Sequence, residues 1–207
     1  MSARPRLVVG LDWSVTSPAA AAQLYSSDGK LQHTWAMCFQ QRRATPQQTV
    51  HQPTETFTLT EWPMYNHRQD KTRWGVVNYH TCCFIEWMKN ICNYYTCDCD
   101  FFIEDYAYGV KKTSSFSKLA EDAGVVMHKI YVRWLQDTHA LAISSIKKFW
   151  SGNGAARKGE MYEAYKRRGY PDLLEPLRCP HPDANPVSDI VDAIAVAGLG
   201  WSQIQIQ

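Results

Sequence analysis

The sequence lacks any long hydrophobic run. No stretch of about 18 consecutive apolar residues is present that could cross a bilayer as a helix, and no charged-then-apolar signal peptide precedes the first predicted strand. Residues 1–6 are also too few for a transit peptide ahead of a strand that begins near Leu7. We therefore expect an intracellular protein, in the cytoplasm or nucleoid, with no membrane partner.

A strong charge of either sign and a paired-cysteine motif are also missing. The net charge of +2 is too small to imply a nucleic-acid partner by itself, so any such inference must rest on local clustering. None of the seven cysteines forms a Cys-x-x-Cys pair, which gives little support to a zinc knuckle. Cys92, Cys97 and Cys99 could hold a metal together with a histidine, but their spacing is poor. Reduced thiols are the default for an intracellular protein.

What is present suits one globular domain. The chain has 207 residues, of which 45% are hydrophobic and 20% are charged. This length and composition allow a full hydrophobic core and do not resemble those of a disordered chain. We expect a single domain over residues 1–207.

The first part of the chain predicts three consecutive antiparallel strands. The apolar run 7–11 is typical of a short buried strand, and it ends directly in Asp12. A second strand is expected over 19–25 and a third over 31–39. Asp28-Gly29 lies between them, and this dipeptide readily adopts the positive φ angles of a tight hairpin.

The next region predicts an irregular segment followed by a helix. Residues 40–55 are rich in Gln, Arg, Thr and Pro, which favours an exposed loop, and partial alternation over 56–62 indicates a further edge strand. Together they form an enlarged loop and edge-strand region at about 40–66. Apolar residues at spacings of three and four then predict a helix from about Thr72 to Tyr94.

The second half alternates between strands and helices. Phe101–Glu104 is a short apolar run that ends in a carboxylate, as a buried parallel strand opening into a site would. A helix is expected over 114–127, with Gly124 packed closely against a neighbour. A second parallel strand over 130–135 and helices over 143–150, 158–168 and from Ser188 onward follow.

These elements predict an α/β fold. Its central mixed sheet would have five strands, three antiparallel and then two parallel, with helices on both faces. If the first strand lies beside the Phe101 strand, Asp12 and Glu104 become neighbours. Asp189 and Asp192 are three residues apart and share one face of the last helix, which could place them over the same point.

Four carboxylates without histidine or thiolate are suited to Mg²⁺ or Mn²⁺. Two Mg²⁺ ions about 3.5 to 4 Å apart can activate water and neutralise the charge of a phosphodiester transition state. Each acid also has a simpler explanation. Asp12 could be a turn or capping residue, and Asp189 and Asp192 could be first-turn acids favoured by the helix dipole. Glu104 is harder to explain in this way, because an unpaired charge after an apolar strand is costly.

Basic and aromatic side chains cluster along the same elements. They could form an ordinary solvated face, or they could bind DNA phosphates and stack on an opened base step. The candidate DNA-binding residues are Tyr106, Tyr108, Lys111, Lys112, Lys118, Lys147, Lys148, Arg157 and Lys158.

In the order and spacing of its motifs, the chain resembles the RuvC-type Holliday junction resolvases of the RNase H-like superfamily. The resemblance covers most of the chain outside 39–93 and 171–186. It rests on Gly-Leu-Asp12-Trp-Ser-Val-Thr-Ser, Ile-Glu104-Asp-Tyr-Ala-Tyr-Gly, the helix 116–127, Ile146-Lys147-Lys148-Phe-Trp-Ser-Gly-Asn-Gly-Ala-Ala-Arg-Lys158, and Ser-Asp189-Ile-Val-Asp192-Ala-Ile-Ala-Val-Ala.

The resemblance implies a metal-dependent endonuclease that acts as a homodimer on four-way DNA junctions during recombination, repair or replication. Asp12, Glu104, Asp189 and Asp192 match the family's metal-binding carboxylates, which hold two Mg²⁺ ions per site, with Mn²⁺ as a substitute. Lys147 and Lys158 match basic residues near the scissile phosphate, and we expect Lys158 to assist catalysis.

Two departures from the family pattern stand out. The usual position of an aromatic wedge is taken by Ala107, which leaves Tyr106 or Tyr108 as substitutes. The enlarged region at 40–66 resembles phage or viral relatives, and such a source would place the protein in an infected host cell.

Other functions would produce related patterns. Another RNase H-like nuclease, acting on flaps or RNA–DNA hybrids, would have a similar metal site. Gly-Leu-Asp-x-Ser also resembles the phosphate-binding hairpin of actin-like small-molecule kinases, although these need a second similar domain. A non-catalytic binder of DNA structure would have no evident use for four separate acids.

Overall fold

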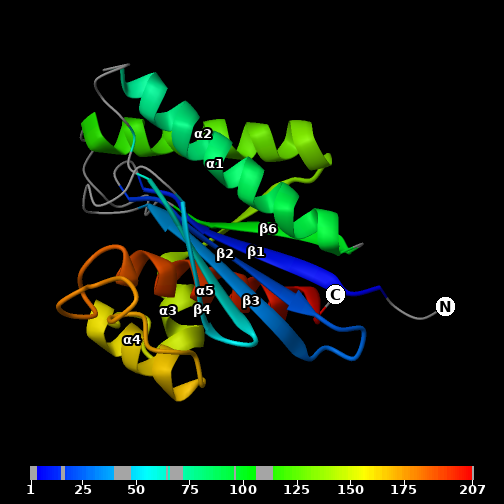
Figure 1. The fold of residues 1–207 in the computed structure, drawn as a ribbon, viewed down its shortest axis with the longest axis vertical. Coiled ribbons are helices and arrows are strands. Elements are labelled where there is room, and N and C mark those ends of the chain that lie inside the picture. Colours follow the sequence, from blue (N-terminus) through cyan, green and yellow to red (C-terminus); the bar gives the residue numbers. More distant parts are fainter. Residues whose placement is uncertain are drawn as a thin grey trace.

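A mixed β-sheet runs through the centre of the protein, as the computed structural model in Figure 1 shows. The structure describes residues 4–14, 17–39, 48–63, 65, 72–95, 97–105 and 114–206. Over these residues the sheet has seven strands in the order β4-β5-β3-β2-β1-β6-β7. The strands are β1 (Arg6–Asp12), β2 (Ala19–Tyr25), β3 (Leu31–Phe39), β4 (Thr49–Thr54), β5 (Phe57–Trp62), β6 (Asp98–Glu104) and β7 (Thr138–Leu141).

Helices cover both faces of the sheet, as predicted (Figure 1). Helices α1 and α2 lie on one face and α3, α4 and α5 on the other. Because each face buries its own apolar cluster, the central strands are buried on both sides. The helices are α1 (Arg73–Tyr94), α2 (Ser114–Trp134), α3 (Ile143–Ser151), α4 (Lys158–Arg167) and α5 (Val187–Ile204).

The predicted first three strands are confirmed. Strand β1 pairs antiparallel with β2, which pairs antiparallel with β3. Gly29 in the β2–β3 turn has a φ of 83°, a conformation that glycine adopts without steric cost. Strand β6 lies parallel to β1, with Leu11 opposite Ile103. The two strands therefore end side by side, at Asp12 and Glu104.

The sheet has two more strands than the five predicted, and both belong to the enlarged region. The edge strand expected over 56–62 is confirmed as β5, which runs parallel to β3. Part of the predicted loop 40–55 forms β4, which pairs antiparallel with β5. Strand β4 is largely exposed, so its sequence carries no alternation of apolar and polar residues that would reveal it.

The predicted strand over 130–135 was wrong. Residues 130–134 continue α2, where Ala123, Val126 and Ile130 form the buried stripe at helical spacing. The fifth predicted strand is instead β7, which pairs parallel with β6. Only its last residue, Leu141, is buried, and a strand this short and exposed gives almost no apolar signal.

The expected close packing of Gly124 was also wrong. Gly124 is exposed, and a Cβ added there would have no neighbour within 4 Å. Ala120 on the same helix is exposed as well. The side chain of Phe116 lies outside the described residues.

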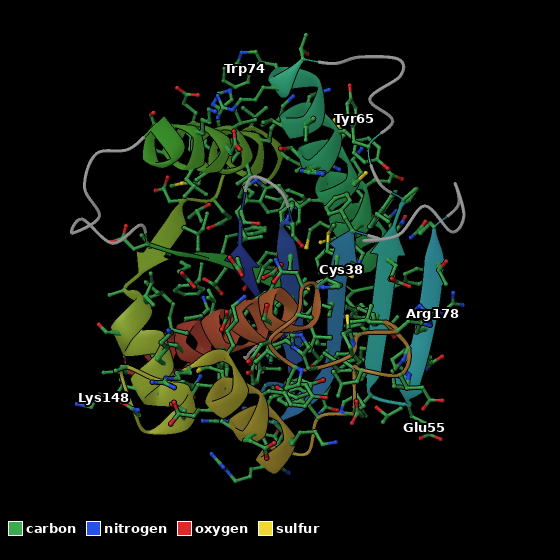
Figure 2. All side chains as sticks on the ribbon, turned by 90° about the vertical axis from the view of Figure 1, so that its left-hand side faces the viewer. Cys38, Glu55, Tyr65, Trp74, Lys148 and Arg178 are labelled. Carbon is green, nitrogen blue, oxygen red and sulfur yellow. The ribbon has the colours of Figure 1, made fainter. Side chains whose placement is uncertain are left out.

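Helix α5 packs directly onto the central strands, and this contact positions the site. Figure 2 shows the helix running across the strands. A Cβ at Gly10 in β1 would overlap the backbone of Ala193 and Ala197, and one at Gly200 would overlap the ring of Phe102. Glycine in the middle of an apolar strand thus allows the helix to touch the sheet backbone. The N-terminal turns of α5 are held above the ends of β1 and β6.

None of the helices in the described part of the chain is both long enough and apolar enough to cross a membrane.

Candidate active site

Four carboxylates converge at the C-terminal ends of two neighbouring strands inside the sheet. Asp12 ends β1 and Glu104 ends the adjacent parallel strand β6. Asp189 and Asp192 lie in the first turns of α5, which crosses these strands. The charges of Glu104, Asp189 and Asp192 all act on the carboxylate of Asp12. Three elements far apart in the sequence therefore supply one cluster of like charge.

The cluster makes ionisation costly, and burial is the main cause. Burial, followed by the charge of Glu104, raises the pKa of Asp12 well above its ordinary value. The pKa of Glu104 is raised to about 7 by burial and by Asp192, and that of Asp192 to about 6 by burial and by Asp189. Burial also raises the pKa of Asp189. Carboxylates that repel one another in a water-poor site are stabilised by a bound cation.

Two lysines face the cluster from α3 and α4. Lys147 lowers the pKa of Glu104 and of Asp192, whereas Lys158 lowers that of Asp12 and of both α5 aspartates. Lys158 Nζ donates to Ser188 Oγ at 2.9 Å and to Asn185 Oδ1 at 3.3 Å. The ammonium group is therefore held beside the carboxylates.

The donor chemistry of the cluster fits a hard divalent cation. All four candidate ligands are carboxylates, and Asp189 Oδ2 is buried without a hydrogen-bond partner among the described residues. A buried, unpaired carboxylate oxygen is costly unless something else binds it. Over the described ranges, no three His, Cys, Asp or Glu side chains already stand in a metal-binding arrangement. The carboxylates are thus coupled through their charges without forming a closed coordination sphere.

Comparison with solved structures identifies the fold. The Thermus thermophilus RuvC structure in complex with Holliday junction substrate matches with a TM-score of 0.53 and 12% identity, covering 98% of this chain and 96% of that one. The chain has an RNase H-like fold. A second Thermus thermophilus RuvC structure gives a TM-score of 0.49 and 13% identity, covering 97% and 96% of the two chains. No protein-family model matches the chain, and no curated protein matches it in sequence.

The predicted basic residues lie on different layers of this RNase H-like fold. Lys147 is partly buried beside Glu104, whereas Lys148 lies on the outer side of α3 (Figure 2). Arg157 is exposed at the start of α4, and Lys118 is exposed on α2, across the sheet from α3 and α4. Lys118 is therefore on the other layer from Lys147 and Lys158. Outside the described residues are Tyr106, Ala107, Tyr108, Lys111 and Lys112.

Several side chains that support the candidate site were not predicted. The last helix was expected from Ser188 onward, but it begins at Val187 and its cap position is Pro186. The Ser188 hydroxyl instead lies 2.8 Å from Asn185 Oδ1 and 3.2 Å from Asp189 Oδ1, so it connects Lys158 to the carboxylates. Serine is common at the start of a helix, so this role was not predictable from the sequence. It follows from the contact between Ser188 and Lys158 of α4.

The residues that follow Asp12 also have a structural role. Trp13 is 4% exposed and packs edge-on against Phe84 at 5.6 Å between ring centroids, which anchors the end of β1 on α1. Ser14 Oγ accepts a hydrogen bond from the Ser17 backbone N–H at 3.0 Å. The Ser17 side chain in turn lowers the pKa of Asp189 through a hydrogen bond. The turn after β1 thus helps to hold α5 over the site.

Proposed function

We propose that this chain is a metal-dependent endodeoxyribonuclease that resolves four-way DNA junctions by paired phosphodiester hydrolysis during recombination, repair or replication. The observation that carries the proposal is the convergence of four mutually repelling carboxylates, with two lysines beside them, at the C-terminal ends of β1 and β6 in an RNase H-like fold. One structure of similar fold is a RuvC in complex with a Holliday junction.

Asp12, Glu104, Asp189 and Asp192 would hold the metal, with Mg²⁺ as the expected ion and Mn²⁺ as a substitute. When bound, two such ions would activate water and neutralise charge on the phosphate. The unpaired Oδ2 of Asp189 and the all-oxygen donor set support this assignment.

The chain's own residues account for the placement of charge around the phosphate. Lys158 is tethered through Ser188 and Asn185, so its ammonium group is oriented before substrate arrives. A preoriented cation stabilises charge that develops in a transition state without having to reorganise. Lys147, which lies beside Glu104, would bind a phosphate of the DNA strand that is cut.

Branched DNA is the proposed partner, and the protein would act as a homodimer. A four-way junction is resolved by two symmetric cuts, and two sites related by a two-fold axis can make them. Lys148 and Arg157 are exposed on the same layer as Lys147 and Lys158 and suit phosphate binding. The enlarged 40–66 region, which includes β4 and β5, is the basis for proposing a phage or viral origin.

A panel of DNA substrates tests the proposal. Mobile and fixed four-way junctions, a flap, an RNA–DNA hybrid and plain duplex are incubated with the protein with Mg²⁺ or with a chelator. We expect symmetric paired nicks on the junctions alone, and only with Mg²⁺. Cleavage of the flap or hybrid with an intact junction would assign the chain to another RNase H-like nuclease activity. Tight junction binding with no cleavage of any substrate would indicate a non-catalytic binder.

A further inference from the structure

Three cysteines gather at the end of β6 opposite to Glu104. Cys92 lies in the last turn of α1, and Cys99 is the second residue of β6. Their sulfur atoms are 3.9 Å apart, which is direct contact between two thiols. Cys97, just before β6, also forms a hydrogen bond with the thiol of Cys99. All three side chains are partly exposed, so a small molecule in solution can reach the cluster.

The surroundings of Cys92 favour its thiolate. A hydrogen bond with the Cys99 thiol, a second with the indole of Trp134 and the charge of Arg133 together lower the pKa of Cys92 to about 7. In the same cluster the pKa of Cys99 is raised by its hydrogen bonds with Cys92 and Cys97 and by burial. The thiolate form of Cys92 is therefore more accessible at neutral pH than that of an ordinary cysteine.

We propose that Cys92 and Cys99 form a thiol–disulfide exchange site that a low-molecular-weight disulfide oxidises. The Cys92 thiolate attacks one sulfur of the reagent, forms a mixed disulfide and releases one thiolate. That thiolate takes the proton of Cys99, and the Cys99 sulfur then attacks the Cys92 sulfur and expels the second thiolate. In total, two protein thiols and one reagent disulfide become one protein disulfide and two small thiols.

The fold fits this division of roles. The two sulfurs are already in contact at 3.9 Å, and they must approach to about 2.05 Å to form a disulfide bond. The bond would join the end of α1 to the start of β6, two elements packed into the same apolar cluster. Cys97 and Cys99 are only two residues apart in extended chain, where the Cα separation of about 6.6 Å is near the upper limit for a disulfide.

The site is separate from the proposed nuclease centre. Cys99 is five residues before Glu104, which is roughly 16 Å along a strand. Oxidation of the pair does not depend on whether the carboxylates bind metal or cut DNA, so the two proposals can fail independently.

The test follows the oxidation of each thiol by mass spectrometry. The full chain is reduced, desalted without oxygen, and incubated with glutathione disulfide at pH 7.5. Free thiols are then blocked with N-ethylmaleimide before intact-mass measurement and peptide mapping. Of the seven cysteines, we expect five to carry N-ethylmaleimide, with a single cross-link between the remaining two, Cys92 and Cys99. Added dithiothreitol should reverse it.

Single cysteine substitutions show which thiol carries out each step of the exchange. In Cys99→Ser the mixed disulfide at Cys92 cannot be resolved, so a stable glutathione adduct on Cys92 is expected. In Cys92→Ser we expect reaction at Cys99 to slow by about tenfold or more, because the attacking thiolate is gone. Cys82→Ser is the matched control, since Cys82 is an exposed thiol on the same helix whose contact is Asn78; it should leave the cross-link unchanged. Thermal unfolding of each variant checks that the fold is intact.

Three results would overturn the proposal. One is a cross-link that does not contain Cys92. Another is a Cys99→Ser protein in which glutathione adds to Cys82 as fast as to Cys92. The third is a set of thiols that resist both reagents until a metal chelator is added, which would mean that a soft metal ion occupies the cluster.

Discussion

At the scale of single residues, the carboxylate cluster makes the stability of the folded protein depend on pH. Because the pKa of Glu104 rises to about 7 and that of Asp192 to about 6, the folded protein binds protons more tightly than the unfolded chain. The stability that this provides is fully present below the unfolded values near 4 and is lost as the pH rises through about 6 to 7.

The free energy of unfolding should therefore fall between pH 4.5 and pH 8 when divalent cations are absent. The Glu104→Gln variant should be more stable than wild type at pH 8, by on the order of 2 to 3 kcal/mol, with little difference at pH 4.5. Urea unfolding at the two pH values measures this. Saturating Mg²⁺ should remove most of the loss in wild type, and an equal stability of variant and wild type at pH 8 would show that the cluster carries no such cost.

Lys158 is expected to act on turnover and not on affinity. The Lys158→Met variant removes a preoriented cation while leaving the four carboxylates in place, so kcat for junction cleavage should drop by about 100-fold with Kd nearly unchanged. Single-turnover cleavage and a binding assay in Ca²⁺ separate the two. Lys89→Met on α1, where the lysine pairs with Glu86 on the other layer, is the matched control. A Lys158→Met rate within about threefold of wild type would exclude the role.

At the scale of elements, the contact between α5 and β1 sets the geometry of the site. Gly10 has no room for a side chain, so Gly10→Ala forces α5 away from the strand, with an expected destabilisation of about 1 to 3 kcal/mol and weaker Mg²⁺ binding. Gly124→Ala is the opposite case, because its Cβ meets nothing and alanine favours a helix, with a gain of about 1 kcal/mol. Chemical denaturation and metal titration of both variants check the contrast. Equal effects of the two substitutions would contradict the packing.

The same elements show what the sequence could and could not predict. Apolar periodicity identifies buried strands and amphipathic helices. This is why β1 to β3, α1 and the position of Asp12 beside Glu104 were predictable. Strands β4 and β7 are exposed at the two edges of the sheet, and their pairing depends on neighbours that the local pattern does not contain. For the same reason, the tether of Lys158 to Ser188 was not visible from either segment alone.

At the scale of the whole molecule, the small net charge makes DNA binding a matter of local clustering. Lys147 and Lys148 of α3 and Arg157 at the start of α4 lie on the layer that carries α5, and they would act together on phosphates. If the proposed dimer neutralises six or more phosphates, junction affinity should fall by about 10³-fold or more between 50 and 200 mM salt. Fluorescence anisotropy with a labelled junction measures the slope. A nearly flat response would count against this surface.

The Asp12→Asn substitution tests the central claim most directly, because Asp12 faces the other three carboxylates from the central strand. The variant keeps the size and shape of the side chain and removes its charge. The measurement is cleavage of a four-way junction by wild type and variant in Mg²⁺, beside junction binding in Ca²⁺. We predict equal binding and a loss of cleavage of more than about 100-fold, since even residues that only support metal ligands cost 10 to 100-fold. Cleavage by Asp12→Asn at the wild-type rate, with binding unchanged, would contradict a metal centre built on Asp12.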